Sequence, residues 1–168
     1  SAKLMTKKRT FEDFVDAGEH LVKTGITQRG AIIGHGGSAG GMLMGAIANQ
    51  RPDLFAGIVA EVPFVDVLNT MLDDALPLTP PEWLEWGNPI NDATVFHEIS
   101  SYSPYDNVKQ QLYPPILCIA GISDSRVTYW EPLKWVSKIR ALMQGGGPVL
   151  LMTHLESGHA GASGRFKA

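Results

Sequence analysis

A serine, an aspartate and a histidine are the side chains of this sequence that could act together on a carbonyl group. Ser38 is the central residue of segment 36–40 (Gly-Gly-Ser-Ala-Gly), which has the G-x-S-x-G pattern of a nucleophile elbow. A serine hydroxyl is a weak nucleophile at neutral pH, so it needs an imidazole to accept its proton and a carboxylate to orient that imidazole. Asp124 and His159 follow Ser38 in the chain. The three residue types indicate nucleophilic catalysis by serine.

The glycines around Ser38 have a structural reason in this interpretation. A sharp turn from strand to helix needs backbone angles that most residues avoid, and a helix packed closely on its strand leaves no room for a Cβ at Gly36 or Gly40. The segment could instead be a helix cap or a phosphate-binding loop. However, no Lys-Ser or Lys-Thr follows at P-loop spacing, and the partial dinucleotide pattern at residues 34–39 has no obvious acidic partner. Phosphate binding is therefore disfavoured.

The elements that would position these residues can be read from the apolar pattern. Leu133, Val136 and Ile139 are expected on the buried face of a helix that covers residues 129–143. Strands are predicted at residues 31–33, 58–62, 116–120 and 149–152, and further helices at residues 10–24 and from Ser38 to about residue 50. Because apolar strands alternate with helices, we expect an α/β fold, with a largely parallel sheet and helices on both faces.

Ligands of such sheets bind at the carboxyl ends of the strands. Ser38, the loop at residues 121–126 and the loop at residues 154–159 each follow a predicted strand, so they are expected to meet at one edge. Their catalytic candidates occur in the chain order Ser…Asp…His, which is the order of α/β-hydrolases. We therefore predict Ser38 as nucleophile, Asp124 as orienting acid and His159 as base.

Other titratable residues leave alternatives open. His154 is the alternative base, and Glu61 or Asp66, both after the second strand, is the alternative acid. Asp124 could be a turn-forming residue and His159 an ordinary loop histidine. The histidines have no zinc-ligand spacing such as H-E-x-x-H, so no metal and no cofactor are expected.

Composition excludes several classes of partner. The 168 residues are 44% hydrophobic and 18% charged with a net charge of −3, and no apolar run approaches membrane-spanning length. Nucleic acid and membrane are therefore not expected as partners. Cys118 is the single cysteine, which excludes an internal disulfide framework and, with no signal peptide evident, favours a cytoplasmic location.

Several longer motifs resemble one family. They are Gly36–Met44 (GGSAGGMLM), Val62–Asp66 (VPFVD), Glu85–Pro89 (EWGNP), Tyr102–Val108 (YSPYDNV) and Ser157–His159 (SGH). Together they are similar to the catalytic domain of the oligopeptidase B branch of the prolyl oligopeptidase family of serine peptidases. The resemblance covers nearly the whole chain, and it implies the same roles for Ser38, Asp124 and His159 as the residues themselves do.

The resemblance also implies roles for residues around the triad. The backbone N–H of Ala39 would supply one oxyanion donor, and Arg126 would hold a substrate carbonyl. Members of this branch cleave after Lys or Arg, and Glu82 matches an acidic specificity residue, although Leu84 stands where a second acid is expected. Glu82 and Arg126 could instead be plain surface charges.

The resemblance further concerns the extent of the chain. We expect residues 1–168 to be part of a single α/β-hydrolase catalytic domain that lacks its first strands, with an irregular specificity region at residues 64–115 and no β-propeller. An uncovered sheet edge would then favour self-association. The leading expectation is a peptidase for oligopeptides, and the alternatives are an esterase-type hydrolase or a non-catalytic truncated fragment.

Overall fold

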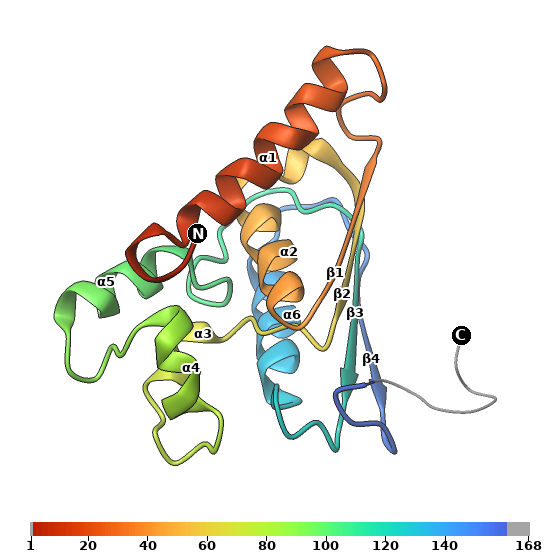
Figure 1. Cartoon of the computed structure of the whole chain (residues 1–168). Helices are drawn as coiled ribbons and strands as arrows, with labels where there is room; N and C mark the ends of the chain where they lie inside the picture. Colours follow the sequence, from red (N-terminus) through yellow and green to blue (C-terminus); the bar gives the residue numbers. More distant parts are fainter. Residues whose placement is uncertain (1, 161–168) are drawn as a thin grey trace.

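A parallel sheet is the centre of the computed structural model, which describes residues 2–160 (Figure 1). Its strand order is β1-β2-β3-β4, and all neighbouring pairs are parallel. The strands are β1 (Ile32–Gly37), β2 (Phe55–Glu61), β3 (Ile116–Gly121) and β4 (Val149–His154). Each predicted strand is therefore present, and all four are longer than the apolar runs that indicated them.

Helices connect the strands. They are α1 (Lys8–Lys23), α2 (Ala39–Gln50), α3 (Val67–Met71), α4 (Thr79–Trp86), α5 (Ala93–Tyr102) and α6 (Trp130–Leu142), with short 3₁₀ turns at Leu4–Thr6 and Pro52–Leu54. Helix α2 packs on β1 and β2, helix α6 packs on β3 and β4, and α1 lies across α2 (Figure 1). No helix within residues 2–160 is long and apolar enough to cross a membrane.

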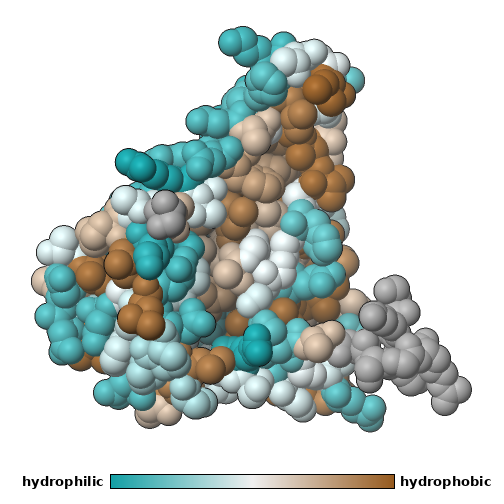
Figure 2. All heavy atoms as spheres, in the orientation of Figure 1, coloured by the Kyte–Doolittle hydropathy of each residue, from teal (hydrophilic) through white to brown (hydrophobic). Residues whose placement is uncertain are grey.

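The two faces of the sheet differ in their covering. Within residues 2–160 the helices lie on one face (Figure 1), and burial alternates along β1 and through most of β2. On the other face Ile33 is 62% exposed and Leu150 49%. Figure 2 shows a strip of apolar surface beside β1. The expected helices on both faces are thus found on one face only in the described part. A short apolar run does not reveal whether a strand is buried on one face or two.

Part of segment 64–115 packs into a second, smaller core. Phe64, Trp86 and Tyr102 pack with Phe11 of α1 and Met42 of α2 in a cluster separate from the core beneath the sheet. The segment contains the short helices α3, α4 and α5 between irregular turns. Helices α3, α4 and α5 therefore lie beside the sheet, at the end where β1 meets α2 (Figure 1). Val65, Val108 and Tyr113 of the same segment join the core beneath the sheet.

The buried face of α6 differs in part from the prediction. Val136 and Ile139 are buried as expected, but Leu133 is 45% exposed and Trp135 is fully buried. Pro132, Trp135, Val136 and Ile139 form the i, i+3, i+4, i+7 stripe that faces the sheet. The prediction that Leu133 lies on the buried face was therefore wrong, and Trp135 is buried in its place.

Strands β1 and β4 form the edges of the sheet within residues 2–160. An edge strand presents unpaired backbone groups that another chain can bind. Self-association through such an edge stays a prediction.

Candidate active site

Ser38 occupies the turn between β1 and α2. Its φ of 55° lies in the left-handed region, which is strained for a residue with a Cβ. Its backbone N–H donates to the carbonyl of Glu61 at 2.9 Å, and its carbonyl accepts from the N–H of Phe64 at 3.1 Å. These bonds to the end of β2 hold the strained turn, so the serine hydroxyl has a fixed position at the sheet edge.

Two glycines near Ser38 are required by close approach. A Cβ on Gly36 would lie 2.3 Å from the carbonyl oxygen of Gly40, and one on Gly41 would lie 2.5 Å from Cβ of Pro63. A Cβ on Gly40 would meet no atom within 4 Å. The expectation that packing requires glycine on both sides of the serine is correct at Gly36 and wrong at Gly40. The close contact on the helix side occurs one residue later, where α2 passes Pro63.

The loop after β3 presents Asp124, which is 7% exposed. Its Oδ1 accepts backbone N–H groups from Arg126 at 2.8 Å and Val127 at 3.0 Å, and its own N–H donates to Gly121 at 3.2 Å. The carboxylate is therefore both a turn residue and a fixed acceptor. Its second oxygen, Oδ2, faces the loop that follows β4.

The loop after β4 lies directly against this acid loop. The carbonyl of Ser157 accepts the N–H of Ser123 at 3.2 Å, and the carbonyl of His154 accepts the N–H of Ile122 at 3.0 Å. A Cβ on Gly121 would lie 2.4 Å from the carbonyl oxygen of Ser157, so glycine is needed there too. This backbone pairing carries the imidazole of His159 toward Asp124.

The structure brings the three predicted side chains together. Nδ1 of His159 lies 2.8 Å from Oδ2 of Asp124, and Nε2 lies 3.1 Å from Oγ of Ser38. The side chain of His159 is 21% exposed and that of Asp124 is 1% exposed. A proton on Nδ1 directed at Asp124 leaves Nε2 free to accept the serine proton. This arrangement can activate a hydroxyl for attack on a carbonyl carbon.

The alternative acids and base lie elsewhere. Glu61 Oε1 is 3.1 Å from Nε2 of His35 on the open face of the sheet. Asp66 is 2% exposed and pairs with Lys134 at 2.5 Å. His154 ends β4 and contributes its backbone carbonyl to loop pairing. The carbonyl of Glu61 accepts the backbone N–H of Ser38, but no hydrogen bond described for the side chain of Glu61 or Asp66 reaches the Ser38 hydroxyl.

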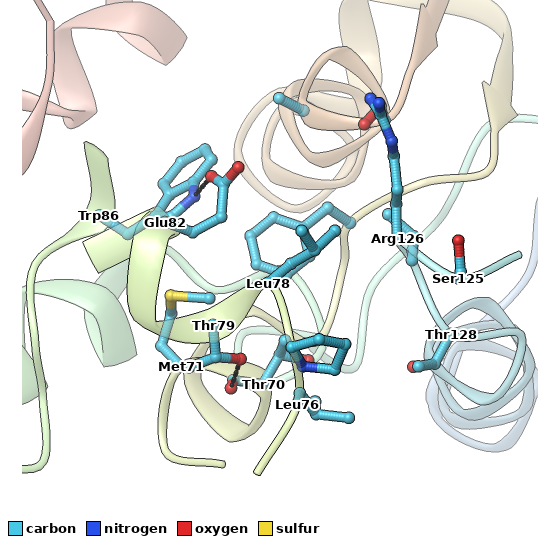
Figure 3. Close-up of a pocket in the computed structure, with 15 residues that line it drawn as sticks. Thr70, Met71, Leu76, Leu78, Thr79, Glu82, Trp86, Ser125, Arg126 and Thr128 are labelled. Atoms are coloured by element: carbon cyan, nitrogen blue, oxygen red, sulfur yellow. Dashed lines mark hydrogen bonds between the residues drawn. The ribbon is translucent and has the colours of Figure 1, made fainter. Parts of the chain in front are cut away.

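A cavity of about 340 Å³ opens beside Ser38 and extends to α4. Figure 3 shows Glu82 and Trp86 of α4 on one side and Arg126 of the acid loop on the other. Its remaining lining is largely apolar: Ala39, Phe64, Met71, Leu76, Pro77, Leu78 and Val127, with Thr70, Thr79, Ser125 and Thr128 as the polar members. A long side chain with a charged end fits the chemistry of this cavity.

The residues predicted around the triad have distinct positions. Ala39 is the first residue of α2 and lines the cavity, so its N–H belongs to the helix N-terminus, which favours a developing anion. Arg126 and Glu82 are exposed lining residues, and Oε2 of Glu82 accepts the Nε1–H of Trp86 at 2.8 Å. Leu84 is 80% exposed.

A buried carboxyl behind the cavity was not predicted from sequence. Glu131 is fully buried, and burial raises its pKa to about 7. It accepts hydrogen bonds from the Thr70 hydroxyl at 2.8 Å and from the N–H of Asp66 at 3.0 Å. Thr70 lines the cavity, so Glu131 ties α6 to the cavity wall. The only sequence signal was its place before Pro132, in the first turn of a predicted helix.

Trp86 was also not singled out from sequence as a cavity residue. It stands four residues after Glu82, the spacing that puts two side chains on one helix face. That spacing could have pointed to their contact.

The model of the prolyl oligopeptidase family matches residues 1–168. The chain is 47% identical over 165 residues to dipeptidyl aminopeptidase BI from Pseudoxanthomonas mexicana and 46% identical over 164 residues to protease 2 from Moraxella lacunata. These alignments cover 98% of this chain but only 23% and 24% of the two relatives.

Solved structures give the same result for the fold. Oligopeptidase B from Trypanosoma brucei, in a closed form with covalently bound antipain, matches with a TM-score of 0.93 and 52% identity over 96% of this chain and 22% of its own. Oligopeptidase B from Leishmania major matches with a TM-score of 0.91 and 50% identity over 94% of this chain and 22% of its own. The predicted α/β-hydrolase fold is confirmed.

Proposed function

Since this chain belongs to the prolyl oligopeptidase family, we propose that it carries the catalytic site of a serine peptidase that hydrolyses oligopeptides. One observation carries the proposal: the imidazole of His159 lies within hydrogen-bond distance of both the Asp124 carboxylate and the Ser38 hydroxyl. The covalently bound antipain in the Trypanosoma brucei oligopeptidase B is consistent with covalent chemistry at such a site.

The geometry supports an acyl-enzyme mechanism. Oγ of Ser38 attacks the peptide carbonyl carbon while Nε2 of His159 accepts its proton, and Asp124 stabilises the imidazolium that forms. The N–H of Ala39 donates to the negative oxygen of the tetrahedral intermediate. The imidazolium then gives its proton to the leaving amine, and the acyl group remains on Ser38. A water activated by His159 completes hydrolysis.

The cavity supports a preference for Lys or Arg before the scissile bond. Its walls are largely apolar, and among its described lining residues Glu82 is the only carboxylate. A basic side chain can lay its methylene groups on these walls and bring its cationic end to Glu82. In this proposal Arg126, on the opposite side of the cavity, donates to a backbone carbonyl of the substrate.

Two measurements on the full-length protein test the proposal. A panel of peptide amides with Arg, Lys, Pro or Phe before the bond should be cleaved fastest at Arg and Lys, and Glu82→Gln should remove that preference. A fluorophosphonate probe should label Ser38, and Ser38→Ala should abolish the labelling. Turnover of esters without amides would indicate the esterase alternative. Absence of labelling would contradict a catalytic role.

A further inference from the structure

The indole ring of Trp86 is held rigidly beside the cavity. Trp86 is 3% exposed, and its ring packs against Phe64 with the centroids 5.4 Å apart. Nζ of Lys7 lies 4.3 Å from the ring centroid, and Lys7 is itself paired with Glu85 at 2.7 Å. The ring is therefore fixed by an aromatic neighbour and an anchored cation, and so is the direction of its Nε1–H.

This fixed N–H acts on Glu82. Nε1 of Trp86 donates to Oε2 of Glu82 at 2.8 Å, which is the dashed line between the two side chains in Figure 3. The bond restrains the orientation of an otherwise exposed carboxylate and takes one of the two acceptor sites on Oε2. Leu84 is directed to solvent with 80% of its surface exposed, and no other described lining residue carries a carboxylate. A cationic substrate would therefore meet one carboxylate that already has a donor.

The two basic side chains differ in what they need from a carboxylate. The guanidinium of arginine gains most from two parallel N–H···O bonds, one to each carboxylate oxygen, whereas the ammonium of lysine is a compact charge that one oxygen can bind. A guanidinium that pairs with both oxygens must share Oε2 with the indole N–H, whereas an ammonium can bind Oε1 alone.

We propose that Trp86 is a positioning residue whose N–H on Oε2 weakens paired recognition of a guanidinium by Glu82, so that this site accepts lysine nearly as well as arginine before the scissile bond. The inference rests on the proposed function, because it concerns how Glu82 would bind the basic side chain of the substrate. In it Trp86 acts through Glu82 and does not touch the reacting atoms.

The test compares kcat/KM for matched Arg and Lys peptide amides in the full-length protein. Wild type should favour Arg by less than about 10-fold. Trp86→Phe, which removes the N–H and keeps an aromatic ring, should raise the Arg:Lys ratio by about 5- to 10-fold, which is the net worth of one ordinary hydrogen bond. The change should appear in KM for the Arg substrate more than in kcat. Trp83→Phe is the matched control, because the Trp83 indole is on the same helix but donates to the carbonyl of Met71 at 3.1 Å.

Smaller ring size could disturb packing, so a second replacement is informative. Benzothienylalanine at position 86 keeps the two-ring shape and replaces the N–H with sulfur, and it should give the same rise in the Arg:Lys ratio with an unchanged thermal midpoint. Glu82→Gln distinguishes a failure of the proposed preference for basic residues from a failure of the proposed role of Trp86. If Glu82→Gln leaves Arg and Lys turnover unchanged, the proposed basic preference fails and this inference with it. If Glu82→Gln lowers both while neither Trp86 replacement moves the ratio beyond twofold, this inference alone is overturned.

Discussion

The carboxylate of Asp124 and the imidazole of His159 face each other across 2.8 Å, although the residues are 35 positions apart in the chain. Oδ1 of Asp124 already accepts two backbone N–H groups of its own loop, so only Oδ2 faces His159. The acid loop thereby fixes which ring nitrogen carries the proton. Nδ1 donates to Asp124, and Nε2 is left as the acceptor toward Ser38.

This relationship predicts the effect of Asp124→Asn. The amide keeps an oxygen for the loop N–H groups but presents an NH₂ group to Nδ1, which favours the wrong tautomer of His159. We expect kcat for an arginyl amide to fall about 10⁴-fold with little loss of stability, as a triad of this type requires. Steady-state kinetics on the full-length protein measure it, with the exposed Glu156→Gln of the neighbouring loop as control. More than a tenth of wild-type kcat in the Asn variant would contradict the assignment.

The glycines after Ser38 give a prediction about stability. Gly41→Ala would put a Cβ 2.6 Å from Cα of Pro63, which is backbone and cannot move aside, so we expect a loss of more than about 2 kcal/mol in the free energy of unfolding. Gly40→Ala is the matched control, because it adds the same group where no atom lies within 4 Å. It should be neutral or stabilising by up to about 1 kcal/mol, since alanine favours a helix. Thermal and urea unfolding of the two variants compare them directly. Equal effects would mean that α2 does not pass Pro63 this closely.

The position of the candidate triad could be predicted from sequence because it follows from the topology of the parallel sheet. Ser38, Asp124 and His159 each follow an apolar strand, and parallel strands end at one edge, so the three loops had to converge. The fold class followed from the same alternation of strands and helices. The distances between the side chains depend on loop conformations that the strand pattern does not show.

What could not be predicted depends on contacts between distant segments. Lys7 and Glu85 are 78 residues apart, yet their pairing beside Trp86 fixes the ring that meets Glu82. Glu131 looked like an ordinary helix residue, because nothing in its own segment shows that α3 covers it. The covering of the sheet on one face within residues 2–160 was missed for the same reason. An apolar run indicates that a strand is buried, but it does not indicate which segment of the chain covers each face.

Cys118 allows a test of the core. It is fully buried in β3, and burial raises the pKa of its thiol to about 12. Because the thiolate is the reactive form, the folded protein should not react with iodoacetamide at pH 8. Mass spectrometry of the peptide that contains Cys118 should find alkylation only after denaturant is added. Modification of the native protein at the rate of a free cysteine would show that β3 is not covered by α6.

Glu131 predicts how stability depends on pH. Its pKa in the folded protein is about 7, above the ordinary value of 4.5, because burial disfavours the charged form. A raised carboxyl pKa means that the folded state binds the proton more tightly than the unfolded chain. The stabilising contribution is therefore full below pH 4.5 and is lost as the pH rises through about 7. A rise of this size corresponds to about 3 kcal/mol.

Glu131→Gln removes the titrating group and keeps an oxygen that can accept from Thr70 or from the N–H of Asp66. Between pH 5 and pH 8 the wild-type protein should therefore lose about 2 to 3 kcal/mol more of its free energy of unfolding than the variant does. Urea unfolding of both full-length proteins at the two pH values measures this difference. Glu12→Gln, at an exposed position on α1, should behave as wild type. If Glu131→Gln has the same pH dependence as wild type, then Glu131 is already ionised at pH 5 in the folded protein, and its burial against α3 does not control its charge.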